Sequence, residues 1–278
     1  MKSERLVIFD YSGTLSLEAA LFSRPERLVA ELKGCGLADL GIATPEVFWA
    51  EIVNPTWQEG STTNIGYENI MKRCIRERLN PDVTDREIDR SVSSFVAKYF
   101  GTSTVHPQWR PILERVAGDE TICGVVATDH YCEATGYIVW YLKSLGIDAL
   151  SVESIETDVT GHFYVANSAD LGAHKAERLF WERLKQSLSL EAVTDIIIVD
   201  DFGFNETAGD AYATLVKVDK RKALTESLLE ETFSAPVETV LFTIEGSDDR
   251  EGNRVAKISE VSDMITDRLW PPQKRSVY

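Results

Sequence analysis

The sequence contains few cysteines, and they lie far apart. Its four cysteines are Cys35, Cys74, Cys123 and Cys132, and no two of them form a CxxC pair. This spacing excludes the dense disulfide framework of small secreted domains and the paired-cysteine pattern of structural zinc sites. We therefore expect reduced thiols that serve as small packing residues.

Long apolar runs and positive charge are also scarce. No run approaches the roughly 18 apolar residues that a membrane span needs, and the first one, residues 6–9, is too short for a signal-peptide core. The 29 basic residues face 45 acidic ones, a formal net charge of −16. The lack of a signal-peptide core and of a membrane span predicts a cytoplasmic protein. Because the negative field repels nucleic acid and anionic membranes, we expect neither as a partner. Nothing in the sequence indicates its oligomeric state.

Short β-rich runs recur along the chain, and most are separated by helical stretches. They lie at residues 6–9, 121–127, 149–151, 195–199 and 214–218. Continuous apolar runs are typical of parallel strands that helices cover on both faces. We predict an α/β protein with a Rossmann-like three-layer core and a mostly parallel sheet. The tail adds a predicted strand at 239–244, a turn near 247–252 and a helix at 258–269.

About a hundred residues between the first two runs lack a convincing strand, which is too many for one crossover helix. We predict that residues 16–104 form an inserted helical cap domain and that residues 1–15 and 105–278 form the core. Thr44 and Pro45 are a typical helix start within the cap. A second irregularity, residues 153–166 around Thr160-Gly161, has the pattern of a β-hairpin. The predicted cap helices cover residues 23–33, 44–52, 66–79 and 85–99.

Polar residues follow three of the predicted strands, where ligands bind in open parallel sheets. Asp10 follows the first strand, Thr128-Asp129-His130 the second, and Asp200-Asp201 the run at 195–199. Phosphoryl transfer to a carboxylate needs a nucleophile, hydrogen-bond donors and positive charge. The candidates are Asp10 as nucleophile, Gly13 and Thr14 in a turn whose amides face phosphate, Thr128 as hydroxyl donor, and Lys175 as the cation.

The same acidic residues suit a metal ion. Asp10 and Asp201 supply the hard oxygen ligands that Mg²⁺ prefers, Asp200 is an alternative to Asp201, and Asn205 is a further candidate ligand. Asn205 and Glu206 are candidates for orienting water molecules around the ion.

This order of residues resembles the four motifs of the haloacid dehalogenase-like superfamily. The motifs are Asp10-Tyr11-Ser12-Gly13-Thr14-Leu15, Thr128, Lys175 and Asp200-Asp201, and together they span most of the core. The resemblance implies a phospho-aspartyl intermediate on Asp10, phosphate binding that also involves Asp129, and Mg²⁺ held by Asp10, the Ser12 carbonyl and Asp201. The helical insertion and the expected hairpin resemble the phosphoserine-phosphatase-like branch.

The chain departs from the family pattern at Ser12. Most phosphatases of the family have there a second aspartate, which protonates the leaving group and then activates water. Loss of such a group costs on the order of a hundred- to ten-thousand-fold in rate, so either the leaving group is good or another residue substitutes. Tyr11, His130 and His106 are the nearest candidates.

The expected function is a magnesium-dependent phosphatase-type hydrolase that acts on a small phosphorylated metabolite. A phosphonate hydrolase is an alternative, but it needs an imine-forming cap lysine, and Lys33, Lys72 and Lys98 lie in no convincing motif. A low-turnover phosphometabolite-binding or regulatory protein is another. The acid pair at 200–201 disfavours a metal-free dehalogenase. Specificity is expected to depend on cap residues, with a candidate loop at 60–63 flanked by Trp49, Trp57 and Tyr67.

Overall fold

The computed structural model describes residues 3–79, 83–154, 163–205, 211–244 and 251–271. Its six described strands form one sheet in the order β3-β4-β2-β1-β5-β6, and every neighbouring pair is parallel. This confirms the predicted Rossmann-like α/β class. The strands are β1 (Arg5–Phe9), β2 (Ile122–Thr128), β3 (Ala149–Ser151), β4 (Phe163–Asn167), β5 (Asp195–Asp200) and β6 (Val237–Leu241).

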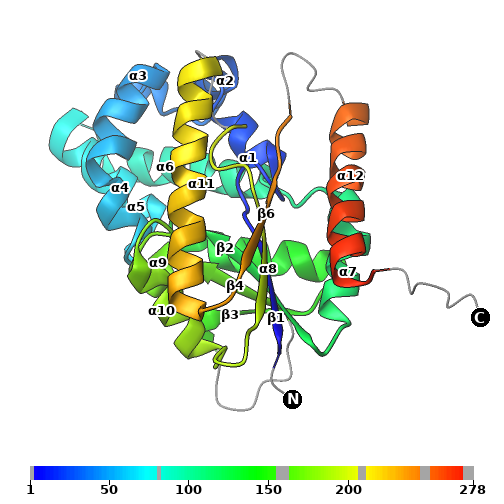
Figure 1. The fold of residues 1–278 in the computed structure, drawn as a ribbon. Helices are drawn as coiled ribbons and strands as arrows, with labels where there is room; N and C mark the ends of the chain where they lie inside the picture. Colours follow the sequence, from blue (N-terminus) through cyan, green and yellow to red (C-terminus); the bar gives the residue numbers. More distant parts are fainter. Residues whose placement is uncertain (1–2, 80–82, 155–162, 206–210, 245–250, 272–278) are drawn as a thin grey trace, which may run out of the picture.

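Helices cover both faces of the sheet, which gives three layers (Figure 1). Alternate residues of β1 point to opposite faces: Val7 and Phe9 pack with α7, α8 and α12, whereas Leu6 and Ile8 pack with α10 and α11. These helices are α7 (Arg110–Ala117), α8 (Glu133–Ser144), α10 (Arg178–Ser187), α11 (Ala211–Phe233) and α12 (Glu251–Leu269). Because both faces are buried, the strands carry continuous apolar runs.

The described part of the predicted cap is helical and lies toward the carboxyl ends of the strands (Figure 1). Thr44 caps α3 by accepting from Val47 N, as its sequence position predicts. The division into core and cap domains stays a prediction. The helices here are α1 (Leu17–Phe22), α2 (Pro25–Gly34), α3 (Pro45–Val47), α4 (Asn54–Ser61), α5 (Tyr67–Cys74) and α6 (Asp85–Thr102), with a 3₁₀ turn at Ala38–Leu40 and π-helical turns at Phe48–Val53 and Ile75–Leu79.

One predicted strand is wrong. The run at 214–218 was expected to be extended, but residues 211–233 form the single helix α11. Val218, Leu229 and Phe233 are buried in it, whereas Leu215 is exposed. Val218 and Leu229 are about three helical turns apart, and Leu229 and Phe233 about one turn, so all three lie on the same face of the helix. The helical period of the long segment therefore outweighs the β propensity of its first residues.

The described residues of the segment 153–166 do not form the expected hairpin. β4 (Phe163–Asn167) is a central parallel strand between β2 and β3, and all five of its residues are buried. Residues 152–154 form a 3₁₀ turn, and 155–162, including Thr160-Gly161, lie outside the described residues. The predicted turn near 247–252 also lies mostly outside them. The tail strand and the closing helix are confirmed as β6 and α12, and two short helical segments, α9 (Ser168–Leu171) and Pro107–Trp109, complete the fold.

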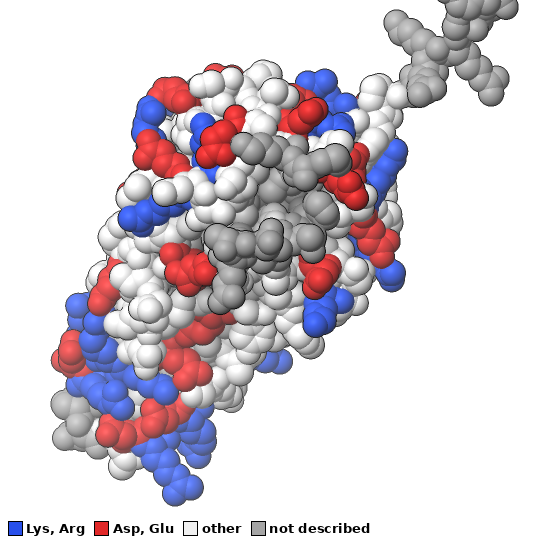
Figure 2. Space-filling view, turned by 90° about the horizontal axis from the view of Figure 1, so that it is seen from below, with Lys and Arg blue, Asp and Glu red and all other residues white. Residues whose placement is uncertain are grey.

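Among the described helices, none is long and apolar enough to cross a membrane. Acidic and basic side chains are interspersed over the face seen in Figure 2. The described residues also form ion pairs, such as those of Arg268 with Asp195 and Glu238. The cytoplasmic location and the expected lack of nucleic-acid and membrane partners stay predictions.

Candidate active site

The nucleophile candidate lies in a tight loop directly after the central strand. Asp10 N donates to Val199 O of β5 at 2.8 Å, and Leu15 N donates back to Asp10 O at 3.3 Å. Gly13 adopts φ +82°, and a Cβ there would meet Asp201 Oδ2 at 2.5 Å. The loop therefore needs glycine for its backbone conformation and also for close approach to the second acidic loop.

The second acidic loop follows β5, the neighbour of β1. Asp200 and Asp201 are buried, and Asp200 Oδ1 accepts from Phe202 N at 2.6 Å. Asp201 N donates to Thr14 Oγ1 at 3.1 Å, while the Asp201 carboxylate accepts from Gly203 N at 2.9 Å. The two loops are thus joined by side-chain and backbone bonds, which positions both carboxylates next to Asp10.

Lys175 reaches this edge from the segment between α9 and α10. Its Nζ donates to Asp10 Oδ1 at 2.5 Å and to Asp200 Oδ2 at 3.0 Å. Its backbone is held as well, because Lys175 N donates to Asp129 Oδ1 at 2.8 Å and Trp181 Nε1 donates to Lys175 O at 2.8 Å. Burial alone lowers the pKa of Lys175, but the charges of Asp10, Asp200 and Asp129 outweigh it and raise the pKa well above its ordinary value.

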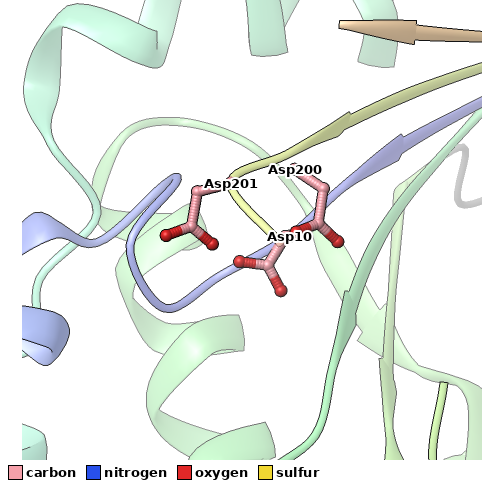
Figure 3. A group of neighbouring side chains, drawn as sticks. All are labelled: Asp10, Asp200 and Asp201. Atoms are coloured by element: carbon pink, nitrogen blue, oxygen red, sulfur yellow. The ribbon is translucent and has the colours of Figure 1, made fainter. Parts of the chain in front are cut away.

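The three carboxylates form a cluster that fits a divalent cation. Asp10, Asp200 and Asp201 converge from two loops (Figure 3), and each offers an oxygen within 4.8 Å of the others. Lys175 supplies one positive charge against the three negative charges of these carboxylates. Hard carboxylate oxygens are the ligands that Mg²⁺ prefers, and a divalent ion offsets the remaining charge.

A cavity of about 740 Å³ opens over this cluster. Thr128, at the carboxyl end of β2, is buried and lines the cavity, so its hydroxyl is a candidate donor to a bound oxyanion. Burial raises the pKa of the neighbouring Asp129, and Lys175 opposes that shift. The lining brings together seven residues of the predicted site: Asp10, Ser12, Thr128, Asp129, Lys175, Asp200 and Asp201.

Three other predicted residues, Gly13, Thr14 and Asn205, connect the two loops and are not in the described lining. Thr14 is fully buried with its hydroxyl on the Asp201 amide. Asn205 Nδ2 donates to Gly13 O at 2.7 Å and to Phe242 O at 3.0 Å, and Asn205 N donates to Asp201 Oδ2 at 2.7 Å. Their roles in phosphate or metal binding stay predictions. Glu206 lies outside the described residues.

The three candidates for the absent acid/base differ in position. The Tyr11 hydroxyl is buried and donates to Ser103 O, and burial raises the pKa of Tyr11 well above its usual range. His106 pairs with Glu251 at 3.0 Å and is not among the described lining residues. Of the three, His130 alone lines the cavity.

His130 is neutral and engaged at both ring nitrogens. Tyr131 N donates to His130 Nδ1 at 2.9 Å, so the neutral ring carries its proton on Nε2, which lies 2.8 Å from the Tyr99 hydroxyl. Burial lowers the pKa of His130 to about 4. A histidine in this state is not protonated at neutral pH and is poorly suited to act as a general acid.

Sequence reasoning missed most of the cavity wall. Trp49, Trp57 and Tyr67, which flank the candidate loop, do line the cavity. None of the loop residues 60–63 is in the described lining. Phe22 and Phe48 on the cap segment and Arg221 on α11 also line it. Aromatic residues at helical spacing are as typical of a core as of a ligand wall, so no local signal distinguished these positions.

Fold and site together define a doubly covered parallel α/β protein with a lysine-bridged carboxylate cluster at the carboxyl edge of its sheet, beneath a helix-walled cavity. No model of a known protein family matches the sequence, and no curated protein matches it. The fold is similar to the crystal structure of 2-haloacid dehalogenase from Pseudomonas syringae pv. Tomato DC3000. The similarity has a TM-score of 0.50 at 14% sequence identity and covers 95% of this chain and 100% of that one. It bears on the fold alone.

Proposed function

We propose that this protein is a magnesium-dependent phosphatase-type hydrolase of the haloacid dehalogenase-like superfamily, acting on a small phosphorylated molecule through a phospho-aspartyl intermediate on Asp10. The observation that carries the proposal is the convergence of Asp10, Asp200 and Asp201, with Lys175 bridging the first two, beneath a cavity of about 740 Å³. The order of the four motifs and the similarity of fold support it independently of that geometry.

The residues of the site suit nucleophilic attack by a carboxylate. Lys175 holds Asp10 by one oxygen and favours its ionised form, which is the form that attacks phosphorus. Asp10 then carries the phosphoryl group as an acyl phosphate until water releases it. Bound Mg²⁺ would be held by Asp10, the Ser12 carbonyl and Asp201, with Asp200 and Asn205 as further candidates, and would offset the charge of the phosphoryl oxygens.

Other residues position the phosphoryl group and its neighbours. The Thr128 hydroxyl is a donor for a phosphoryl oxygen, and Asp129 fixes the Lys175 backbone, so that the ammonium meets Asp10 at a constant place. The walls provided by the cap segment exclude bulk water from the acyl phosphate and strengthen these electrostatic contacts. The phosphoserine-phosphatase-like branch is part of the proposal because the helical insertion directly follows the first motif.

The test is hydrolysis of phosphate monoesters with and without Mg²⁺. Asp10→Asn is expected to lower kcat by at least about a thousandfold because it removes the nucleophile. Intact-protein mass spectrometry after rapid acid quench should detect a phosphoryl adduct on the wild type and none on Asp10→Asn. Asp39→Asn, which alters an exposed acid away from the cavity, is the control and should match the wild type.

The alternatives predict different outcomes in the same assay. A phosphonate hydrolase needs a lysine over the site, but Lys72 pairs with Glu68 and Asp89, and neither Lys33 nor Lys98 is in the described lining. Release of halide from 2-haloacids without added metal would establish a dehalogenase in place of a phosphatase. Tight phosphate-ester binding without turnover or adduct would establish a binding protein.

A further inference from the structure

The part of the cavity wall that the cap segment contributes is uncharged and largely aromatic. Of its described lining residues between positions 19 and 99, none carries a charged side chain, and the polar ones are Ser23, Asn54 and two tyrosines. The rest are small, aliphatic or aromatic. The aromatic members are Phe22, Phe48, Trp49, Trp57, Phe95 and the rings of Tyr67 and Tyr99.

Charged groups lie elsewhere in the described lining. Lys175 is engaged by Asp10 and Asp200, and Arg221 donates from Nη1 to Phe202 O at 3.0 Å. A sugar or amino-acid phosphate brings hydroxyl, ammonium or carboxylate groups that need partners when they are buried. The aromatic wall offers few of these partners, whereas it gains from covering an apolar group.

The acidic groups of the described lining are also engaged. Asp200 accepts from Lys175 and Phe202 N, and Asp201 accepts from two backbone amides of its own loop. Asp129 accepts from Lys175 N. His130 uses both ring nitrogens, and position 12 is a serine. A leaving group over Asp10 thus meets no uncommitted carboxylic acid in this lining, so a group that departs as a stable anion is favoured.

Resting on the proposed function, we infer that the substrate is a phosphate monoester of an apolar, acidic hydroxyl compound: an aryl phosphate. The aromatic wall receives the ring, and the carboxylate cluster receives the phosphate. An aryloxide leaves without prior protonation, because its ring delocalises the charge.

The chemistry balances without a further reactant. An Asp10 carboxylate oxygen bonds to phosphorus while the bond from phosphorus to the aryl oxygen breaks, and its electron pair leaves on the aryloxide. Water then attacks phosphorus, breaks the bond to Asp10 and releases inorganic phosphate. The proton that water loses is taken up by the aryloxide, which gives the free phenol.

Four probe compounds separate the two features of the inference. Phenyl phosphate is apolar with a good leaving group, benzyl phosphate is apolar with a poor one, acetyl phosphate is small and polar with a good one, and phosphoserine is polar with a poor one. We expect kcat/KM for phenyl phosphate to exceed that for benzyl phosphate by about a hundredfold or more. We expect the KM of acetyl phosphate to be well above that of phenyl phosphate, and phosphoserine to be the poorest substrate.

Two tryptophan variants test the wall. Trp49 lines the cavity and is 37% exposed, so Trp49→Ala should leave the fold intact and raise the KM of phenyl phosphate about tenfold, with little change for acetyl phosphate. Trp140 is 60% exposed on α8 and is not in the described lining, so Trp140→Ala is the matched control and should change neither KM. Equal effects of the two variants on both substrates would overturn the role of the wall.

A third variant tests the leaving group. Ser12→Asp places a carboxyl beside the nucleophile and is expected to raise benzyl phosphate turnover more than phenyl phosphate turnover. Asp10-dependent hydrolysis that favours phosphoserine, or equal rates for phenyl and benzyl phosphate in the wild type, would overturn the aryl phosphate inference and leave the proposed function standing. Absence of both turnover and adduct with all four compounds would overturn the proposed function itself.

Discussion

His130 is held by hydrogen bonds to several segments around the cavity. It sits beneath the cap next to Thr128, receives the Tyr131 amide on Nδ1 and contacts the Tyr99 hydroxyl through Nε2. Its backbone N is shared between Asn167 Oδ1 at 3.1 Å and Ser168 Oγ at 3.0 Å. These bonds join the segments around β2, β4 and α6, so His130 acts as a neutral structural link in the wall of the cavity.

Burial of His130 predicts acid sensitivity. Burial lowers its pKa from 6.5 to about 4, so between these values the unfolded chain binds a proton that the folded one does not. The free energy of unfolding should therefore fall as pH drops from 6.5 to about 4, by up to about 3 kcal/mol from this group. Urea unfolding across this range should show a shallower pH slope for His130→Gln. His106→Gln is the control, and equal slopes in all three proteins would contradict the prediction.

At the scale of elements, two segments at neighbouring strand ends carry the three carboxylates of the cluster. β1 and β5 pair in parallel register, so Asp10 and Asp200 leave the sheet side by side. Gly13 lets the first loop turn beneath Asp201, and Asn205 ties both loops to the segment after β6 through its bond to Phe242 O. The geometry of the cluster is therefore a property of three adjacent segments.

Replacing Gly13 should disrupt this arrangement. Gly13→Ala puts a Cβ 2.5 Å from Asp201 Oδ2 at φ +82°, so we expect a loss of about 1–3 kcal/mol in stability and a large fall in kcat. Gly136→Ala is the matched control, because its Cβ would meet nothing within 4 Å inside α8. The control should gain about 0.5–1 kcal/mol and keep full activity. Differential scanning calorimetry and phenyl phosphate hydrolysis measure both, and an active, stable Gly13→Ala would refute the argument.

At the scale of the molecule, the cap segment and the core are joined beside the site. Ser61 Oγ lies 2.6 Å from His174 Nε2, and Trp57 stacks on the His174 ring at 6.1 Å and 7°. His174 directly precedes Lys175, so the contact between α4 and the core lies next to the cation of the cluster. The net charge of −16 means that acidic side chains repel one another across the whole molecule. The buried carboxylate cluster adds to this repulsion locally.

Binding of Mg²⁺ should stabilise the whole fold. At a concentration of 100 Kd, an ion that binds the folded state alone adds about 2.7 kcal/mol, which raises the Tm by about 5–10 °C in a chain of this size. The measurement is thermal unfolding with MgCl₂ against NaCl of equal ionic strength. Asp201→Asn should lose most of the shift, whereas Asp39→Asn should keep it. A shift of equal size in both variants would place the ion elsewhere.

The sequence by itself determined the class of fold and the positions of the polar residues that gather at the carboxyl edge of the sheet. Buried parallel strands need continuous apolar runs, and functional side chains at their carboxyl ends interrupt those runs, so β1, β2 and β5 and the residues that follow them carry local signals. Asp10, Thr128 and Asp200-Asp201 could be found in this way. Lys175 was found by its order among the motifs, and its bond to Asp10 spans 165 positions.

Only the tertiary structure decided how the site is enclosed. The burial of one face of α11, the parallel pairing of β4 and the inward direction of Trp49 and Phe22 depend on contacts between distant segments. Local propensity does not contain these contacts, because the same apolar pattern packs equally well into a core or around a ligand. The polar residues that meet at the carboxyl edge of the sheet could therefore be predicted from the chain, whereas the shape and polarity of the space above them arose from packing.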